Sequence, residues 1–361
     1  MQVMQEELDL YLVSFDQFWK HSRYNDHERL DLRALARKMF QAINGAGDGS
    51  FAECMECWRE GDVLGTMMIY KDPDYHSRKR NDVGCFGLVT ASSSEVLEAM
   101  LEYAKGVFED KGITTFRGPV NAPRFLFGLG VLVRGFDQPG IAGGSINPPE
   151  YARYYDELME KGFFTRVDTY YSGYTDDVKK QELVNQMDFI KDFEIRNPDL
   201  DDLGDLPEQV GRMMNSNLGY RPDYTHPTPE TLRSWAAMYK MVPGGEKYLG
   251  LFYDGDELVG GSLIMPDWFQ LFRGEKVTNA VCDLTIINTK YQGMGLVYNI
   301  FQYDLDTLPL ISDYYEHSSI WAESKTVMRW LTPGPYHFVH INKEYRVYEL
   351  ETGVEPGADA R

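Results

Sequence analysis

Residues Asp283 to Ile300, DLTIINTKYQGMGLVYNI, decide the fold of this chain. The four residues Leu284–Ile287 are apolar or β-branched, as in a buried strand. Asn288 and Thr289 favour a turn, and Leu296–Ile300 returns to the apolar pattern of a helix. The stretch therefore predicts a strand that runs through a glycine-containing turn into a helix.

Two glycines, Gly293 and Gly295, lie where the predicted helix begins. Glycine lets backbone N–H groups approach a ligand closely, and the first amides of a helix together with its dipole favour a phosphate. The segment lacks the Lys-Ser/Thr ending of a P-loop, and its glycines do not fit the G-x-G-x-x-G pattern of dinucleotide-binding proteins. The expected ligand is a cofactor that carries a pyrophosphate. An ordinary glycine turn before a core helix is the competing interpretation.

The segment Tyr291–Val297, YQGMGLV, is similar to the Q/R-x-x-G-x-G/A signature of the GNAT superfamily of acyl-CoA N-acyltransferases. Gln292 matches the first position of the signature and Gly295 the second, whereas Val297 stands where the family has Gly or Ala. The resemblance implies that the cofactor is acetyl-CoA or another acyl-CoA. The residues that it assigns to cofactor binding are Ile286, Ile287, Asn288, Tyr291, Gln292, Gly293, Met294, Gly295, Leu296 and Val297.

The flanking sequence fits the order of parts in a GNAT domain. Tyr248–Asp267 reads as two apolar strands joined through Asp254-Gly255-Asp256, a strong hairpin signal, and GNAT domains carry such a hairpin before the cofactor-binding strand. Ser324–Leu331 has helical character, and Tyr345–Glu349 alternates like a closing strand. The second half of the chain is therefore expected to be a GNAT domain with an acyl-CoA loop.

The first half of the chain repeats this order of parts. It contains a hairpin (Glu53–Asp72), an apolar strand (Val83–Thr90) and a helix opened by the capping box Ser92-x-x-Glu95. A further strand (Thr114–Arg117), a last helix (Tyr154–Phe163) and a closing strand (Val167–Tyr174) follow. Three further phrases look like those of a tandem-GNAT family of mostly uncharacterised bacterial and archaeal proteins: FRGPVN at 116–121, GVLVRGFD at 130–137 and NPPEY at 147–151.

The predicted fold is α/β (α+β in some schemes), with two tandem GNAT-like domains, each a mixed, mostly antiparallel sheet flanked by helices. The predicted domains are residues 1–175, an acidic connector at 176–205, and residues 206–361. The first half has Thr90-Ala91-Ser92-Ser93-Ser94 at its strand-to-helix turn, with no glycine. We therefore expect the second half to bind the cofactor and the first half to be structural. A degenerate site formed by the serine amides of the first half is the alternative.

The chemistry that the resemblance implies is transfer of an acyl group from coenzyme A to an amine. Asp283, at the start of the cofactor strand, is the first candidate for the base or for holding a catalytic water, and Glu323 is the second. The usual acid of the superfamily is a tyrosine in the following helix, where this chain has Arg329-Trp330-Leu331-Thr332. The remaining candidates for the acid are Tyr298, Tyr336 and Tyr345. Each of these residues also has a structural interpretation, as a solvated strand end or as core packing.

Composition and charge restrict the partners. The 361 residues, 43% of them hydrophobic, suffice for two domain cores. A formal charge of -20 opposes binding to nucleic acid or to an anionic membrane and favours a cationic, amine-bearing substrate. The expected partner is a small-molecule or peptide amine, with a homo-oligomer left open. Met1–Leu10 lacks the basic start and apolar core of a signal peptide, which indicates a cytoplasmic protein.

The cysteines give no metal motif. Cys54 and Cys57 form one C-x-x-C pair, Cys85 and Cys282 are single, and neither a second pair nor a histidine pair at helical spacing accompanies them. No metal site is therefore predicted. Two other functions stay open: a non-catalytic protein that binds acyl-CoA as a regulatory ligand, and a transferase of similar tandem fold that uses aminoacyl-tRNA. The net charge argues against the second.

Overall fold

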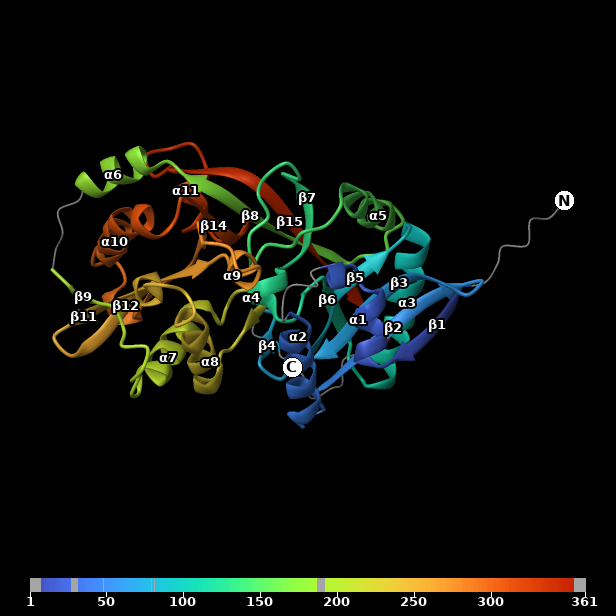
Figure 1. Ribbon diagram of the computed structural model, residues 1–361. Coiled ribbons are helices and arrows are strands. Elements are labelled where there is room, and N and C mark those ends of the chain that lie inside the picture. The colour runs from blue at the N-terminus through green and yellow to red at the C-terminus, as the bar shows by residue number, and fades with distance from the viewer. Residues whose placement is uncertain are drawn as a thin grey trace. The chain divides into compact units, whose positions relative to one another are not determined.

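The computed structural model describes residues 8–26, 32–47, 49–78, 80, 82–186 and 192–353 (Figure 1). The chain forms two compact units. Unit 1 comprises Met1–Tyr75, Arg80–Thr169 and Glu344–Arg361, and unit 2 comprises His76–Lys79 and Tyr170–Lys343. Strands β8 (Arg166–Thr175) and β15 (Val339–Glu351) each contribute residues to both units, and the two-residue strand β4 (Tyr75–His76) lies at a division between them.

Unit 1 is built on a mixed sheet in the order β1-β2-β3-β5-β6-β15, with β7 also paired to β15. Its neighbouring strands are antiparallel except for β5 and β6, which are parallel and are connected by helix α3. Helices α3 and α5 pack on the apolar core, which includes Met100, Phe108 and Tyr155. The elements are β1 (Asp9–Val13), α1 (Phe15–His21), η1 (Arg23–Asp26), α2 (Leu32–Gly45), β2 (Phe51–Arg59), β3 (Asp62–Lys71), β5 (Val83–Ala91), α3 (Ser94–Asp110), β6 (Thr115–Gly118), α4 (Arg124–Phe127), β7 (Val131–Arg134) and α5 (Pro149–Glu160).

Unit 2 repeats the pattern in the order β9-β11-β12-β13-β14-β8. Again the strands are antiparallel except for one parallel pair, β13 and β14, which helix α10 connects. One apolar cluster joins α7 and α8 to the sheet, and another joins α6 to α10. The elements are α6 (Asp177–Asn185), β9 (Glu194–Arg196), α7 (Leu206–Leu218), β10 (Tyr224–Thr225), α8 (Pro229–Tyr239), η2 (Gly245–Tyr248), β11 (Leu249–Asp254), β12 (Glu257–Pro266), α9 (Trp268–Phe272), β13 (Asn279–Ile287), η3 (Thr289–Tyr291), α10 (Leu296–Ile311), β14 (Tyr314–Trp321) and α11 (Met328–Leu331).

The closing strands are exchanged between the two halves of the sequence. The second part of β8 pairs with β14, where Tyr174 lies opposite Glu316, and the end of β15 pairs with β6, where Tyr348 lies opposite Gly118. The sequence analysis kept each closing strand with its own half, so the predicted boundaries differ from the compact units at these two strands. Consecutive elements are usually neighbours in space, and pairing between distant segments leaves no local signal that would have shown the exchange.

Most other elements lie where the sequence predicts them, with small differences at helix ends. Helix α3 is capped by the side chain of Ser93, which accepts a hydrogen bond from the Val96 amide, and not by Ser92. The segment predicted as an acidic connector contains helix α6, which ends at Asn185, and residues 187–191 lie outside the described part. The helix expected at Ser324–Leu331 is reduced to α11, because its first half forms turns. In the part of the chain that the structure describes, no helix has the length and apolarity to cross a bilayer.

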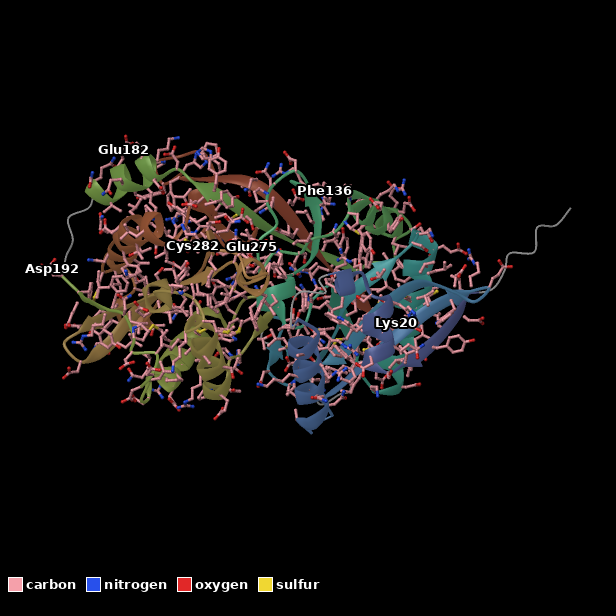
Figure 2. The ribbon with its side chains drawn as sticks, viewed as in Figure 1. Lys20, Phe136, Glu182, Asp192, Glu275 and Cys282 are labelled. Carbon is pink, nitrogen blue, oxygen red and sulfur yellow. The ribbon has the colours of Figure 1, made fainter. Side chains whose placement is uncertain are left out.

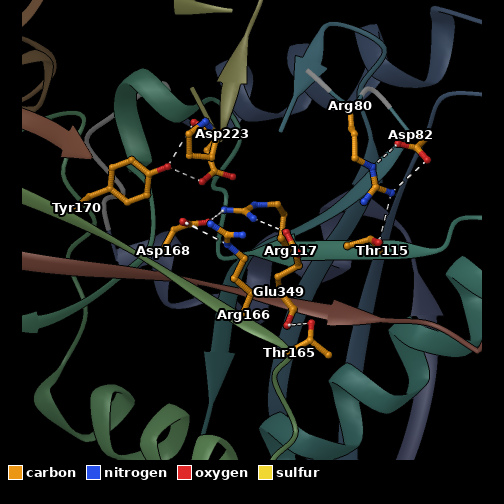
Figure 3. Close-up of polar contacts among 11 residues, drawn as sticks. Arg80, Asp82, Thr115, Arg117, Thr165, Arg166, Asp168, Tyr170, Asp223 and Glu349 are labelled. Carbon is orange, nitrogen blue, oxygen red and sulfur yellow. Dashed lines mark hydrogen bonds and ion pairs between the residues drawn. The ribbon is translucent and has the colours of Figure 1, made fainter. Parts of the chain in front are cut away.

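A buried arginine ties three strands of unit 1 together (Figure 3). Arg117 on β6 donates from Nη2 to Asp168 Oδ2 at 2.7 Å and from Nη1 to Glu349 Oε2 at 2.5 Å. The side chains of Arg117 and Asp168 are almost wholly buried, and Arg166 lies 3.7 Å from the same aspartate. Since Asp168 is on β8 and Glu349 is on β15, these charges hold the closing strands of unit 1 to β6.

We expect Arg117→Met to destabilise the protein strongly. Removing the guanidinium leaves the Asp168 carboxylate buried beside the more distant Arg166, and breaking a buried pair in this way costs about 3–5 kcal/mol. The control is Arg80→Met, because Arg80 pairs with Asp82 at the surface, where such a pair contributes about 0–1 kcal/mol. Urea denaturation measures both variants, and equal losses of unfolding free energy would contradict a structural role for Arg117.

Candidate functional site

A pocket of about 560 Å³ lies in unit 2 where strands β13 and β14 part. The two strands pair in parallel from Asn279 opposite Tyr314 to Cys282 opposite His317. Beyond that pair, residues of both strands line the pocket, together with residues of α7, α10 and α11. Cys282, labelled in Figure 2, therefore marks the closed end of the opening on β13. The volume falls in the range that suits a small-molecule ligand.

Strand β13 carries a bulge at this closed end. Leu263 of β12 lies opposite Leu284, whereas the next residue, Ile264, lies opposite Cys282, so Asp283 is an extra residue in the ladder. Bulges redirect side chains and interrupt regular pairing, and they are frequent beside active sites. Asp283 thus lies between two residues of the pocket wall, Cys282 and Leu284, while its side chain lies outside the described part of the structure.

Strand β14 is also irregular beside the pocket. Its pairing with β8 is interrupted between His317 and Ile320, and Ser319 has a φ of 55°, which is uncommon for a residue with a side chain. Arg221, in the loop after α7, donates from Nη2 to the Ser319 carbonyl at 2.5 Å. The hydroxyl of Ser172 bonds that of Ser318 at 2.9 Å. Side chains from two other elements therefore stabilise this distorted part of the pocket wall.

The other end of the pocket meets a turn that lacks the usual helix cap. Gly293 and Gly295 have φ values of 80° and 83°, and a Cβ at either position would meet no atom within 4 Å. Gly295 precedes α10, and no side chain caps the helix. Among the described residues, the amides of Gly293, Gly295, Leu296 and Val297 have no acceptor. A helix start with free amides and left-handed glycines is suited to bind a phosphate.

Side chains from neighbouring elements position this turn. Asn217 on α7 accepts from the Ile287 amide at 3.3 Å and from Gln292 Nε2 at 3.5 Å. The Tyr291 hydroxyl lies 2.9 Å from Asp254 Oδ2 and 3.0 Å from Glu257 Oε2, at the tip of the β11–β12 hairpin, and its single proton is shared between these two acceptors. These hydrogen bonds raise the pKa of Tyr291 to about 12, so the phenol stays protonated and donates at neutral pH.

The residues that the sequence assigns to cofactor binding divide into three groups. Ile287, Gln292, Gly293 and Val297 line the pocket. Ile286, Tyr291 and Leu296 are buried beneath the turn, and Asn288 caps the short helix η3 by accepting from the Lys290 amide. Met294 and Gly295 form the tip of the turn, where Met294 is exposed. The side chains of the second group support the turn and do not form the pocket wall.

The catalytic candidates are placed at different locations. Tyr298, on the first turn of α10, lines the pocket, and burial raises its pKa. Tyr336 also lines the pocket. Glu323 is exposed in the turn after β14 and lies outside the pocket wall. Tyr345 is a buried residue of β15 in unit 1, opposite Leu132, so it is not part of this pocket.

The structure adds residues that the sequence analysis did not single out. His317, Arg221, Arg329 and Trp330 line the pocket. Among the described side chains of the wall there is no Asp or Glu, so the pocket carries two arginines inside a protein of strongly negative net charge. One signal was present in the sequence: Glu316-His317-Ser318-Ser319 is a polar run in the middle of an otherwise strand-like segment. Buried polar residues on a strand need partners, and so they often mark a site.

The corresponding place in unit 1 is filled by the chain itself. After β5 and β6 part at Cys85 opposite Arg117, the Val120 amide donates to the Phe86 carbonyl at 2.7 Å, and the Leu88 amide donates to Asn121 Oδ1 at 2.8 Å. A Cβ on Gly87 would lie 2.2 Å from the Val120 carbonyl oxygen, so the two segments are in close contact. No room is left for a ligand between these strands.

The helix start of unit 1 is also occupied. The Ser93 hydroxyl caps α3, and Glu95 lies in its first turn. Glu157 accepts a hydrogen bond from the Ser94 hydroxyl, and the Ser92 carbonyl accepts one from Tyr154. Carboxylates at a helix start use the same positive potential that would attract a phosphate. The contacts of unit 1 therefore favour a structural role for this half.

Comparisons with known proteins support the fold. No family model and no curated protein matches the sequence. A conserved protein of unknown function from Enterococcus faecalis V583, described as a probable N-acyltransferase, superposes with a TM-score of 0.55 at 8% identity, over 97% of this chain and 74% of that chain. A tandem GNAT protein from the clavulanic acid biosynthesis pathway superposes with a TM-score of 0.47 at 11% identity, over 97% of this chain and 100% of that chain. A GCN5-related N-acetyltransferase from Anabaena variabilis superposes with a TM-score of 0.49 at 10% identity, over 95% of this chain and 72% of that chain.

The likeness to the Enterococcus faecalis protein and the repeated sheet topology confirm the predicted fold. The chain has two tandem GNAT-like halves, each with a mixed, mostly antiparallel sheet flanked by helices. Identities near 10% show the fold alone, and a fold hosts many functions, so activity has to be argued from the site.

We expect Gly295→Asp to abolish binding of coenzyme A while the protein stays folded. Open space surrounds the Cβ position, but the new carboxylate would compete with a phosphate for the free amides of α10 and would repel it. Calorimetric titration with coenzyme A measures the effect, and circular dichroism checks the fold. Unchanged affinity would contradict the assignment of this turn.

Two variants control this experiment. Gly274→Asp places the same side chain at another left-handed glycine of unit 2, with a φ of 70° and open space around its Cβ, away from the pocket. Ser93→Asp makes the matching change at the helix start of unit 1. Both should leave the affinity for coenzyme A unchanged, and a loss with Ser93→Asp would show a second site.

Proposed function

We propose that the protein is an acyl-CoA-dependent N-acyltransferase that works through the pocket of unit 2. The observation that carries this proposal is the pairing of two features: parallel strands that part after Cys282 and His317, and a helix start with free amides at the far end of the same opening. The distance along β13 from Cys282 to Ile287 is about 16 Å, which suits an extended ligand with a phosphate at one end.

The residues present fit this donor. The free amides of Gly293, Gly295, Leu296 and Val297 would hold the diphosphate at the start of α10, where no acidic residue lies in the first turn. Among the described residues, β14 does not pair with β13 beyond Cys282. Apart from the Ile287 amide, which Asn217 binds, backbone groups on this edge of β13 can therefore bond the amides of the pantetheine arm. The thioester would then lie at the closed end, beside the bulge at Asp283.

The acceptor must reach this end as a neutral amine. A lysine-like amine has a pKa near 10.4, so losing its proton at pH 7 costs about 4–5 kcal/mol, which a nearby base helps to offset. Of the two carboxylates predicted from sequence, Asp283 is on the pocket strand and Glu323 lies outside the wall. We assign Asp283 as the base or as the group that holds a catalytic water.

Two phenols of the pocket wall, Tyr298 and Tyr336, are the candidates for the proton donor to the departing thiolate. Burial raises the pKa of Tyr298, so this phenol keeps its proton at neutral pH. Helix α11, which has Arg329 and Trp330, supplies no phenol in its place.

The lack of a tyrosine in α11 also supports a second candidate function, in which the protein binds acyl-CoA as a regulatory ligand without turnover. Acetyl-CoA binding followed by a test for amine-dependent thiol release distinguishes the two functions.

We expect Asp283→Asn to lower amine-dependent thiol release by about ten- to a thousandfold, because the amide cannot accept the proton of the amine. The affinity for coenzyme A should barely change, since the diphosphate and pantetheine contacts lie elsewhere. Thiol release from acetyl-CoA is measured over a panel of amines, with Glu323→Gln as the matched control.

The two variants give opposite results if the assignment holds. Glu323→Gln should retain wild-type activity, because Glu323 lies outside the pocket wall. An active Asp283→Asn enzyme with an inactive Glu323→Gln enzyme would move the role of base to Glu323. Unfolding of Asp283→Asn would show that Asp283 stabilises the bulge of β13 and does not act in the reaction.

A further inference from the structure

His317 is the residue of β14 at which the parallel pairing ends. It lies opposite Cys282, and both residues are part of the pocket wall. Neighbouring residues of parallel strands are about 4.8 Å apart, so the imidazole stands beside Cys282 at the closed end of the pocket. The rings of Trp330 and Phe338 lie 6.3 and 6.0 Å from its own.

The imidazole of His317 is buried, and one of its two nitrogens has no hydrogen-bond partner in the described part of the chain. The residue is 5% exposed, and Nε2 has no partner among the described residues. Buried polar atoms in folded proteins are almost always bonded, because a buried donor or acceptor without a partner destabilises the folded state. Such a side chain in the wall of a pocket points to a bond that a ligand completes.

Two features of the surroundings keep this imidazole neutral. Burial and the charge of Lys180 lower the pKa of His317 to about 3. Lys180, on α6, is itself buried and paired with Asp304 of α10 at 3.1 Å. The imidazole therefore carries no charge at pH 7, and a neutral ring has one N–H donor and one acceptor nitrogen. A neutral histidine can polarise a carbonyl by donating a hydrogen bond without giving up its proton.

We propose that the neutral imidazole of His317 donates a hydrogen bond to the carbonyl oxygen of the thioester bound at the closed end of the pocket. This inference rests on the proposed function and assigns a catalytic residue that was not among the candidates predicted from the sequence. The bulge on β13 and the irregular segment of β14 flank the same point, so the thioester is enclosed by both strands where His317 stands.

The hydrogen bond would act as negative charge develops on the oxygen. As the amine nitrogen bonds to the carbonyl carbon, the π electrons move to the oxygen, which the imidazole N–H stabilises. When the carbonyl reforms, the carbon–sulfur bond breaks, and sulfur leaves with the electron pair and then takes up a proton. The amine proton goes to the base, and the imidazole keeps its own proton throughout. Loss of one such donor lowers turnover by about 100- to 1,000-fold.

The test follows the carbonyl itself, so it needs no knowledge of the acceptor amine. Infrared spectra of acetyl-CoA labelled with ¹³C at the carbonyl are recorded free and bound to the wild type, to His317→Gln and to His317→Leu. We expect a lower carbonyl frequency in the wild type, a similar frequency in His317→Gln, whose amide also donates, and a return toward the free value in His317→Leu. Coenzyme A, which lacks the carbonyl, should bind all three with equal affinity.

Controls and turnover complete the experiment. His340, which stacks on Tyr174 and lies outside the pocket wall, provides the control His340→Leu, which should match the wild type. With an active amine, His317→Leu should lose about 100-fold or more in turnover, and His317→Gln should retain most of it. His317→Met serves as a second apolar variant if His317→Leu does not fold.

The outcomes separate this inference from the proposed function. A wild type that does not bind acetyl-CoA overturns both. Three other results overturn the role of His317 and leave the proposed function standing. The wild type binds acetyl-CoA without a shift of the carbonyl frequency, an apolar variant keeps the wild-type frequency, or His317→Gln is as impaired as the apolar variants.

Discussion

The candidate site depends on how far β13 and β14 remain paired. Two parallel strands joined by a helix would normally continue their ladder, but here the hydrogen bonds stop after Cys282 and His317. The bulge at Asp283 and the positive φ of Ser319 lie directly beyond that point, one on each strand. Arg221 and Ser172 hold β14 in its irregular course beside the opening.

The two halves show how one topology supports different roles. In unit 1 the space beyond the parallel pair is taken up by Val120 and Asn121, and the helix start is capped by Ser93. In unit 2 the same space is open, and the amides at Gly293 and Gly295 have no acceptor among the described residues. The difference lies in a few residues after the parallel strands. The exchange of β8 and β15 gives each unit a closing strand from the other half of the sequence, so neither sheet is completed by one half alone.

Local features of this fold could be predicted from the sequence, and long-range features could not. The hairpin at Asp254-Gly255-Asp256 and the turn at Gly293 and Gly295 depend on backbone preferences of a few neighbouring residues, so they were visible. The partner strands of β8 and β15 depend on pairing over more than a hundred residues and were assigned to their own halves. His317 was missed because its significance comes from its register opposite Cys282 and from its missing hydrogen bond, which only the folded chain shows. Tyr345 was chosen by residue type, and the structure places it in unit 1.

The central claim is that an acyl-CoA occupies the opening between β13 and β14, with its diphosphate at the start of α10. A crystal structure of the protein with coenzyme A tests this most directly. We expect density for the pantetheine arm along the edge of β13 that faces β14, with the sulfur near Cys282 and His317 and the diphosphate at the free amides of the turn before α10. Coenzyme A bound instead at the start of α3 in unit 1, or an empty pocket at saturating coenzyme A, would contradict it.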